Sequence, residues 1–243
     1  MRVPTPYVAQ FEERTSEFVL LIEDLEASGC TTPDPTVGIT FEHACDAMRD
    51  YARLHAMFED PEVRSREVGW IEPPPRGSDY GTKMLQYGLD HHRDKLTDAF
   101  AELATIYIAE QSALDDAWAA GPQTVLQGDG HIGNIFQDRG RPGFLDWGLV
   151  HVGTPMRDVG YFITMTLSPE LRGQHERELI ERYLREREAA GAHEISFDEA
   201  WLAHRVHASY TVTASCQVVT FPEDAPPQRK VFAAAFLDRC ENA

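Results

Sequence analysis

The amino-acid sequence predicts an α+β protein that is mostly helical. Apolar residues recur at helical spacing over several long stretches, whereas strand patterns are short and gather into two hairpins. The chain has 243 residues, of which 42% are hydrophobic, and its 12 Phe, 8 Tyr and 4 Trp are spread along it. This composition is that of an ordinary globular protein with a sizeable core.

The first predicted element is a β-hairpin near the amino terminus. Residues 7–10 and 18–21 are rich in β-branched and aromatic side chains and flank a polar turn. A Pro-rich segment, 31–36, follows, where regular structure should break. We therefore expect two units, residues 1–28 and residues 29–243.

Helical periodicity dominates the chain after this boundary. Thr40 is a candidate N-cap, and the apolar residues that follow it predict a helix to about Glu59. Residues 60–81 contain four Pro and three Gly, so we expect a long irregular connection there. A second helical stretch, with a kink, is predicted over residues 82–119 and stops at the breaker pair Gly121-Pro122.

A second hairpin and further helices complete the predicted elements. Residues 135–137 and 143–145 have strand composition and flank the turn 138–141. Capping signals then open two helices: Ser168 before a helix that ends near Gly191, and the capping box from Ser196 to Glu199 before a helix over residues 201–219.

Charge and cysteine content exclude several classes of partner. The chain carries 40 Asp and Glu against 22 Lys and Arg, and its formal net charge of -18 repels nucleic acid and anionic lipid. The 4 cysteines have neither paired spacing nor zinc-site spacing. No signal peptide or membrane span is readable. We therefore expect a cytoplasmic protein with no nucleic-acid or membrane partner.

The stretch from Gln127 to Asn134, followed twelve residues later by Asp146, carries the chemistry. If the second hairpin turns near Gly140, Asn134 and Asp146 lie opposite each other at its open end, ~5 Å apart. An amide oxygen and a carboxylate at that separation can share one Mg²⁺, which takes its other ligands from water and phosphate. Asp129 is then free to accept the proton of a reacting hydroxyl. The pattern therefore predicts phosphoryl transfer.

Each of these side chains also has a purely structural interpretation. Asp and Asn often cap turns, and a lone His such as His131 is more often a hydrogen-bonding group than a metal ligand. Asp158 is expected to hold backbone amides of the loop, and His55 is expected to be a satisfied core residue. The functional interpretation is favoured because the Asp-x4-Asn spacing is combined with a later Asp-Trp pair at the end of a hairpin.

The residues around this pattern resemble a known family. Three runs carry most of the similarity: residues 125–136 (VLQGDGHIGNIF), 143–147 (GFLDW) and 153–159 (GTPMRDV). They resemble the aminoglycoside phosphotransferase and choline kinase-like superfamily, whose members share the protein-kinase-like fold. The resemblance implies a helical C-terminal lobe that carries the catalytic loop and the metal-binding hairpin. The first 28 residues would be a remnant of the N-terminal β lobe, consisting of a hairpin and the hinge.

The resemblance also implies a role for individual residues, with ATP and Mg²⁺ as cofactors. Asp129 would be the catalytic base, and Asn134 and Asp146 would be the Mg²⁺ ligands. Four residues would contact adenine: Phe136 and Leu145 beneath its ring, and the Glu23 carbonyl and the Leu25 amide at its edge.

Two departures from the family pattern bear on activity. Gln127 stands where the family has a His, and we expect its amide to keep a hydrogen bond within the loop. The family places a phosphate-covering loop, a strand Lys and a helix Glu before the first hairpin, whereas 6 residues precede Tyr7 and Lys83 is the first lysine. The resemblance therefore implies an N-terminally short chain. It would be the product of a start site placed too far downstream, a short homologue completed by a partner or oligomer, or a degenerate binding protein, the first being preferred.

Three functional hypotheses follow. The first is an ATP- and Mg²⁺-dependent phosphotransferase that acts on a hydroxyl of a small molecule, with the activity of the short chain left open. The second is a non-catalytic kinase-like binding protein, a pseudokinase, and the third and weakest is a metal-dependent phosphohydrolase. The acidic composition permits an amine-bearing acceptor such as an aminoglycoside or choline, but the family also uses neutral and acidic acceptors. Residues 60–81 and the C-terminal helices are expected to select the acceptor.

Overall fold

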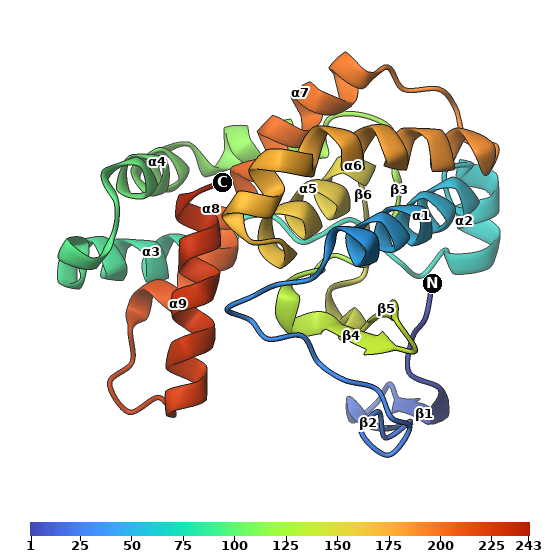
Figure 1. Ribbon diagram of the computed structural model, residues 1–243, viewed down its shortest axis with the longest axis horizontal. Helices are drawn as coiled ribbons and strands as arrows, with labels where there is room; N and C mark the ends of the chain where they lie inside the picture. Colours follow the sequence, from blue (N-terminus) through green and yellow to red (C-terminus); the bar gives the residue numbers. More distant parts are fainter.

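The computed structural model describes all residues from 1 to 243, and helices make up most of it (Figure 1). The strands form three separate two-stranded sheets, and each pair is antiparallel. None of the helices combines the length and the apolar character that a bilayer crossing requires. The prediction of a mostly helical α+β protein is confirmed.

The predicted N-terminal hairpin is present and lies at the edge of the molecule (Figure 1). Its strands are β1 (Pro6–Glu12) and β2 (Glu17–Ile22), and all but one of their residues are exposed. The hairpin is tethered by Arg2, whose guanidinium bonds Glu23 at the base of the hairpin (2.7 Å) and Asp138 of the second hairpin (2.8 Å). The tether therefore joins the two hairpins directly.

Two helices follow, the first predicted and the second not. α1 (Phe41–Met57) begins after Thr40, whose side chain accepts the hydrogen bond of the His43 amide. α2 (Pro61–Val68) lies in the segment that was expected to be irregular, and Asp60 caps its first turn. α2 buries none of its residues, so it has no apolar face that the sequence pattern could reveal.

The kinked helical stretch predicted over residues 82–119 is two separate helices, because the chain leaves the helical path after α3. The elements are α3 (Tyr80–His91), the short 3₁₀ helix η1 (Arg93–Lys95) and α4 (Asp98–Ala119). The Thr97 side chain accepts a hydrogen bond from the Phe100 amide and so caps the start of a new helix. A kink is found as well, but within α4, where Glu110 has non-helical backbone angles.

The C-terminal half is helical, as predicted, but one predicted helix is divided. The elements are α5 (Pro155–Thr166), α6 (Pro169–Ala189), α7 (Phe197–Ala208), α8 (Tyr210–Ala214), η4 (Ser215–Thr220) and α9 (Pro227–Glu241). The N-cap at Ser168 and the capping box of Ser196 with Glu199 are confirmed. The helix predicted over 201–219 breaks at Ser209, whose hydroxyl bonds the Val206 carbonyl and accepts the Trp118 indole hydrogen.

The second hairpin is formed by β4 (Ile135–Asp138) and β5 (Arg141–Phe144), but its predicted register is off by one residue. Arg139 and Gly140 both have positive φ, as a two-residue type I′ turn requires. The turn therefore centres between them, and Asn134 faces Leu145, whose amide bonds the Asn134 carbonyl (2.8 Å). Asp146 lies one residue beyond the position expected for it.

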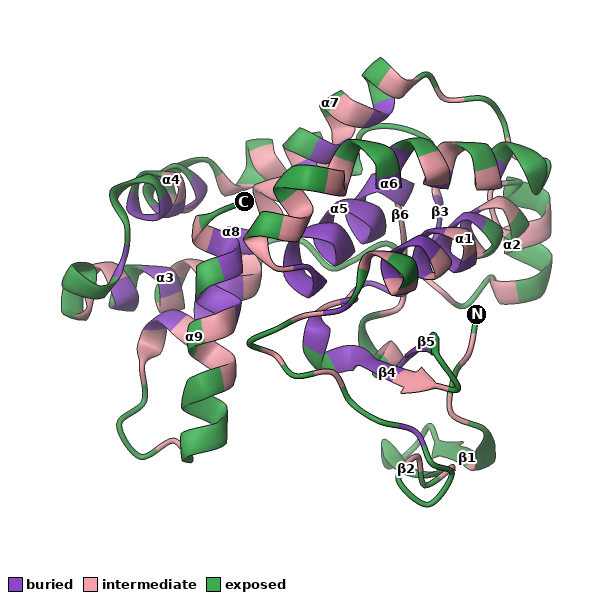
Figure 2. Cartoon of the chain, in the orientation of Figure 1, coloured by how far each residue is buried: buried purple, intermediate pink, exposed green.

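The core surrounds α5, all of whose residues are buried (Figure 2). One side chain cluster joins α5 to α1, α6 and the β4–β5 hairpin, and a second joins it to α3, α4, α8 and α9. β3 (Thr124–Leu126) and β6 (His151–Gly153) flank the β4–β5 hairpin in the sequence and pair with each other, so this short sheet holds both ends of the segment between them. The loop that follows β3 is thus anchored on the most buried helix of the protein.

Candidate active site

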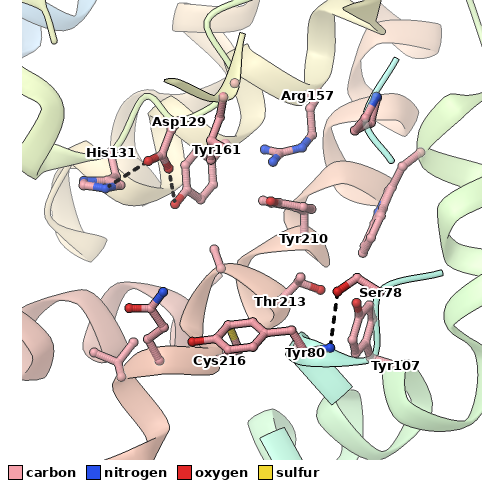
Figure 3. Close-up of a pocket in the computed structure, with 18 of the residues that line it drawn as sticks. Ser78, Tyr80, Tyr107, Asp129, His131, Arg157, Tyr161, Tyr210, Thr213 and Cys216 are labelled. Atoms are coloured by element: carbon pink, nitrogen blue, oxygen red, sulfur yellow. Dashed lines mark hydrogen bonds and ion pairs between the residues drawn. The ribbon is translucent and has the colours of Figure 1, made fainter. Parts of the chain in front are cut away.

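A cavity of about 1340 Å³ opens beside the loop that carries Asp129 (Figure 3). Its walls come from the irregular segment before α3, from α3, α4 and α5, and from the helices α8, η4 and α9. Arg76 and Tyr80, from the segment expected to select the acceptor, line the cavity, whereas Trp70 and Asp79 do not. Asp129 lies in its wall, so a ligand in the cavity can reach this carboxylate.

The loop is fixed from below by Asp158 of α5. The Asp158 carboxylate accepts the amide hydrogens of Gln127 (2.7 Å) and Gly128 (2.9 Å), as predicted. His55 lies 3.3 Å from the same carboxylate and 2.9 Å from the Tyr183 hydroxyl, so it is a satisfied core residue. Burial alone would raise the pKa of Asp158, but the bonds from His55 and the two amides hold it below its usual value.

The loop passes so close to its neighbours that two of its positions accept only glycine. Gly128 has φ +89°, and a Cβ there would lie 2.2 Å from the Leu149 carbonyl oxygen. A Cβ at Gly130 would lie 2.2 Å from the Tyr51 hydroxyl. The glycines of the motif therefore serve the close packing that positions Asp129.

Gln127 makes the hydrogen bonds within the loop that the sequence predicted for it. Its side-chain oxygen accepts the Asp129 amide (2.9 Å), and its side-chain nitrogen donates to the carbonyls of Leu145 and Asp146 (3.0 Å each). The side chain thus connects the loop to the segment that follows β5. This connection sets the position of Asp146 relative to Asp129.

Three side chains surround the Asp129 carboxylate. The Tyr161 hydroxyl donates to one oxygen (3.4 Å), and the Asn134 amide donates to the other (3.0 Å). His131 Nε2 lies 3.5 Å from that second oxygen, and its Nδ1 accepts the amide of Gly133 (3.0 Å). Burial raises the pKa of Asp129, although the charges of His131 and Arg157 oppose the rise, and burial lowers the pKa of His131. A more basic carboxylate is a better acceptor for a hydroxyl proton.

Asn134 and Asp146 retain the oxygen atoms that a hard cation needs. The Asn134 amide nitrogen is used on Asp129, and its side-chain oxygen accepts no hydrogen bond from the protein. One Asp146 oxygen accepts the Gly148 amide at 3.2 Å, and the other accepts none. Asp146 has φ +46°, a left-handed conformation that is uncommon for residues other than glycine and that clusters at functional sites. This donor set fits Mg²⁺.

The four residues expected around adenine lie outside the cavity. The Glu23 carbonyl and the Leu25 amide make no hydrogen bond within the protein, so both are free for a ligand. Phe136, however, is fully buried, with the Arg2 guanidinium over its ring (5.3 Å to the centroid), and Leu145 is half-buried. Arg2 therefore covers Phe136, one of the two residues predicted to lie beneath the adenine ring.

Arg157 and Tyr161 are site residues that the sequence analysis did not identify. They are four residues apart on α5 and therefore lie on the same face of the helix, where both line the cavity (Figure 3). The signal was present in the sequence as a cation and an aromatic hydroxyl at helical spacing. His204 and His207 are buried and do not line the cavity.

Comparisons with known proteins identify the fold. Residues 1–195 match the phosphotransferase enzyme family. A search of curated proteins found no match. Among solved structures, choline kinase LicA from Streptococcus pneumoniae is 12% identical, with 95% of this chain and 73% of that chain covered and a TM-score of 0.53. A choline/ethanolamine kinase family protein from Mesorhizobium loti is 16% identical, with coverages of 98% and 72% and a TM-score of 0.54.

The GDP complex of wild-type aminoglycoside 2'-phosphotransferase-IIIa is a further structural neighbour. It is 12% identical, with 99% of this chain and 76% of that chain covered and a TM-score of 0.53. Likeness at such low identity shows the fold alone, and that fold is the protein-kinase-like one implied by the sequence. Because the family match extends over most of the chain, the protein belongs to the phosphotransferase enzyme family.

Proposed function

We propose that this protein is a phosphotransferase that moves the terminal phosphoryl group of ATP to a hydroxyl of a small molecule held in the cavity, with Mg²⁺ as cofactor. The observation that carries the proposal is the position of Asp129. Its carboxylate faces the cavity on one side and contacts Asn134, a metal-ligand candidate, on the other. A base in this position can reach an acceptor hydroxyl beside the phosphate.

Asp129 would accept the hydroxyl proton as the hydroxyl oxygen bonds to the transferred phosphorus, while the bond from that phosphorus to the bridging oxygen breaks and ADP leaves. Tyr161 and Asn134 each hold one of its two oxygens and so orient the carboxylate toward the cavity. The raised pKa of Asp129 suits this role, because burial makes the carboxylate more basic. Phosphoryl transfer requires little more covalent help than this from the protein.

Asn134 and Asp146 would hold Mg²⁺ through the oxygen atoms that the protein leaves free. The ion, when bound, supplies positive charge that neutralises the phosphate oxygens. The free Glu23 carbonyl and Leu25 amide would bond the adenine edge, with residues 1–28 as a part of the β lobe and residues 29–243 as the helical lobe. Structural neighbours solved in complex with GDP and with AMP support a nucleotide as the phosphate donor.

A second candidate function is a non-catalytic, kinase-like binding protein. One observation favours it, namely the Arg2 guanidinium over the ring of Phe136, which is where the adenine ring would stack. Calorimetric titration with ATP, with and without Mg²⁺, separates the two functions. Binding that requires Mg²⁺ supports the phosphotransferase, and the lack of any nucleotide binding supports the binding protein.

The catalytic assignment is tested with Asp129→Asn, which keeps the size of the side chain and removes its basicity. We expect transfer of labelled phosphate from ATP to a panel of hydroxyl acceptors to fall by ~10²–10⁴-fold, the usual contribution of a general base. Asp94→Asn is the matched control, because Asp94 is exposed and makes no hydrogen bond or ion pair. Equal rates for Asp129→Asn and the wild type would rule out Asp129 as the base.

A further inference from the structure

Arg157 is a buried cation without a protein partner. Three arginines are buried, namely Arg157 (7% exposed), Arg187 (2%) and Arg239 (2%). Arg187 bonds the Glu59 carboxylate and a backbone carbonyl, and Arg239 bonds two backbone carbonyls. The Arg157 side chain makes no hydrogen bond and no ion pair, and its Nη1 atom is fully buried. The other two buried arginines therefore have hydrogen-bond partners within the protein, and Arg157 has none.

The Arg157 guanidinium lines the cavity and is held in place by aromatic rings (Figure 3). It stacks over the ring of Tyr210, 3.0 Å from the centroid, and lies 5.1 Å from the centroid of Tyr161. Tyr161 is the residue whose hydroxyl bonds Asp129. The cation and the proposed base are thus linked through one tyrosine and open into the same cavity.

A guanidinium removed from water without an anion is costly, because neither solvent nor a carboxylate replaces its hydration. Stacking on tyrosine recovers part of this cost but leaves the in-plane N–H groups unused. A carboxylate is the ligand that matches their geometry, since it accepts two parallel hydrogen bonds from one guanidinium. We propose that Arg157 binds a carboxylate group of the acceptor, so that the substrate is a hydroxy acid whose hydroxyl reaches Asp129.

The charges around the cavity agree with an anionic acceptor. The chain as a whole has 40 acidic and 22 basic side chains, whereas the cavity is lined by five Arg and Lys and four Asp and Glu. The acidic excess therefore lies elsewhere on the protein. An amine-bearing acceptor, which the overall composition had permitted, would have to approach Arg157, and the Tyr210 face that could stack on a cation is already covered by the guanidinium.

This inference rests on the proposed phosphotransferase function, and its test separates the two. The test compounds form matched triplets, in which one hydroxyl compound carries a carboxylate, an amide or an amine at the same position. Mandelate, mandelamide and 2-amino-1-phenylethanol are one such triplet, and larger triplets carry a second ring. Binding to the wild type and to Asp129→Asn is measured by calorimetry without nucleotide, so that no turnover is needed. We expect the carboxylate to bind at least ~10-fold more tightly than its amide in one or more triplets, as a charge-assisted bidentate contact predicts, with the amine weakest.

Arg157→Met should remove this preference while Arg157→Lys keeps part of it, and thermal melting shows whether each variant is folded. If Arg157→Met does not fold, the wild-type triplets still decide the matter. Tighter binding of the amines, no binding by any triplet, or a carboxylate preference that survives in Arg157→Met would overturn the inference. Phosphate transfer to an amine-bearing acceptor would overturn it and keep the proposed function. Carboxylate binding that depends on Arg157 but is never followed by transfer would refute the phosphotransferase and leave the anion site.

Discussion

The two hairpins of this protein are built alike and placed in opposite environments. Both are antiparallel, and both were recognised from short strand patterns. In β4–β5, Ile135, Phe136 and Phe144 are at most 1% exposed, whereas in β1–β2 Phe11 and Phe18 are 65% and 72% exposed. The comparison shows that a strand pattern predicts the hairpin but not its burial, which depends on the helices that reach it.

Burial determines what each hairpin can do. β4–β5 packs against α1 and α5, so the segments at its open end, which carry Asn134 and Asp146, are fixed relative to Asp129. β1–β2 has no such support, and its exposed apolar side chains form the kind of surface that usually contacts another protein segment.

The largest difference between the hairpins is expected when one ring is removed from each. Phe144 contacts the rings of Tyr51 and Phe162, with centroids 5.0 and 6.2 Å apart, so Phe144→Ala should lower the free energy of unfolding by ~3–5 kcal/mol. Phe18→Ala, the matched control, should change it by less than about 0.5 kcal/mol. Urea unfolding measures both, and similar losses would show that β1–β2 is buried in solution.

A smaller effect is expected for Asp158, which anchors the loop beside β4–β5 and has no counterpart beside β1–β2. Asp158→Asn weakens the bonds to the loop amides and should cost ~1–3 kcal/mol at neutral pH. The folded-state pKa of Asp158 is lowered, so the stability that its charge contributes is complete above its ordinary pKa of about 4 and is lost as the pH falls through the lower folded value. The difference in the free energy of unfolding between the wild type and Asp158→Asn should therefore be smaller at pH 3 than at neutral pH, as unfolding curves measure. A difference that stays constant with pH would show that the charge of Asp158 is not involved, and Asp94→Asn serves as the control.

The smallest effect is expected at the tether between the hairpins. The Arg2 hydrogen bond, together with bonds to Thr5 and Ser28, lowers the pKa of Glu23 to about 2. The tether is therefore complete above the ordinary pKa of Glu23 and is lost only as the pH falls through about 2. Arg2→Gln should speed amide hydrogen exchange several-fold in β1–β2 and leave β4–β5 unchanged, as followed by mass spectrometry. Equal acceleration in both hairpins would mean that Arg2 supports the whole fold.

Much of the fold could be predicted because it depends on local chemistry. Thr40, Ser168 and Ser196 start helices through bonds to amides three residues away, and such signals are complete within the sequence. α2 could not be predicted because it has no buried face, and the break at Ser209 depends on Trp118, which is distant in the sequence. Contacts between distant segments are the part that local patterns omit.

The candidate site divides in the same way. Asp129 and Asn134 belong to one short motif, and the structure brings them into contact at 3.0 Å. Asp146 lies one residue beyond its predicted position opposite Asn134, because the turn is centred between Arg139 and Gly140. The unpartnered state of Arg157 could not be predicted at all, since it requires knowing that no carboxylate from any other element reaches it.

The way in which Asp158 holds the loop has a consequence for how the sequence can vary. Its carboxylate bonds main-chain amides, which every residue except proline supplies, so the anchor does not depend on which side chain stands at position 127. Gln127 can therefore replace the His of the family pattern without detaching the loop. A different side chain at this position would change the contacts with the carbonyls of Leu145 and Asp146, while the backbone path to the Asp129 carboxylate would stay the same.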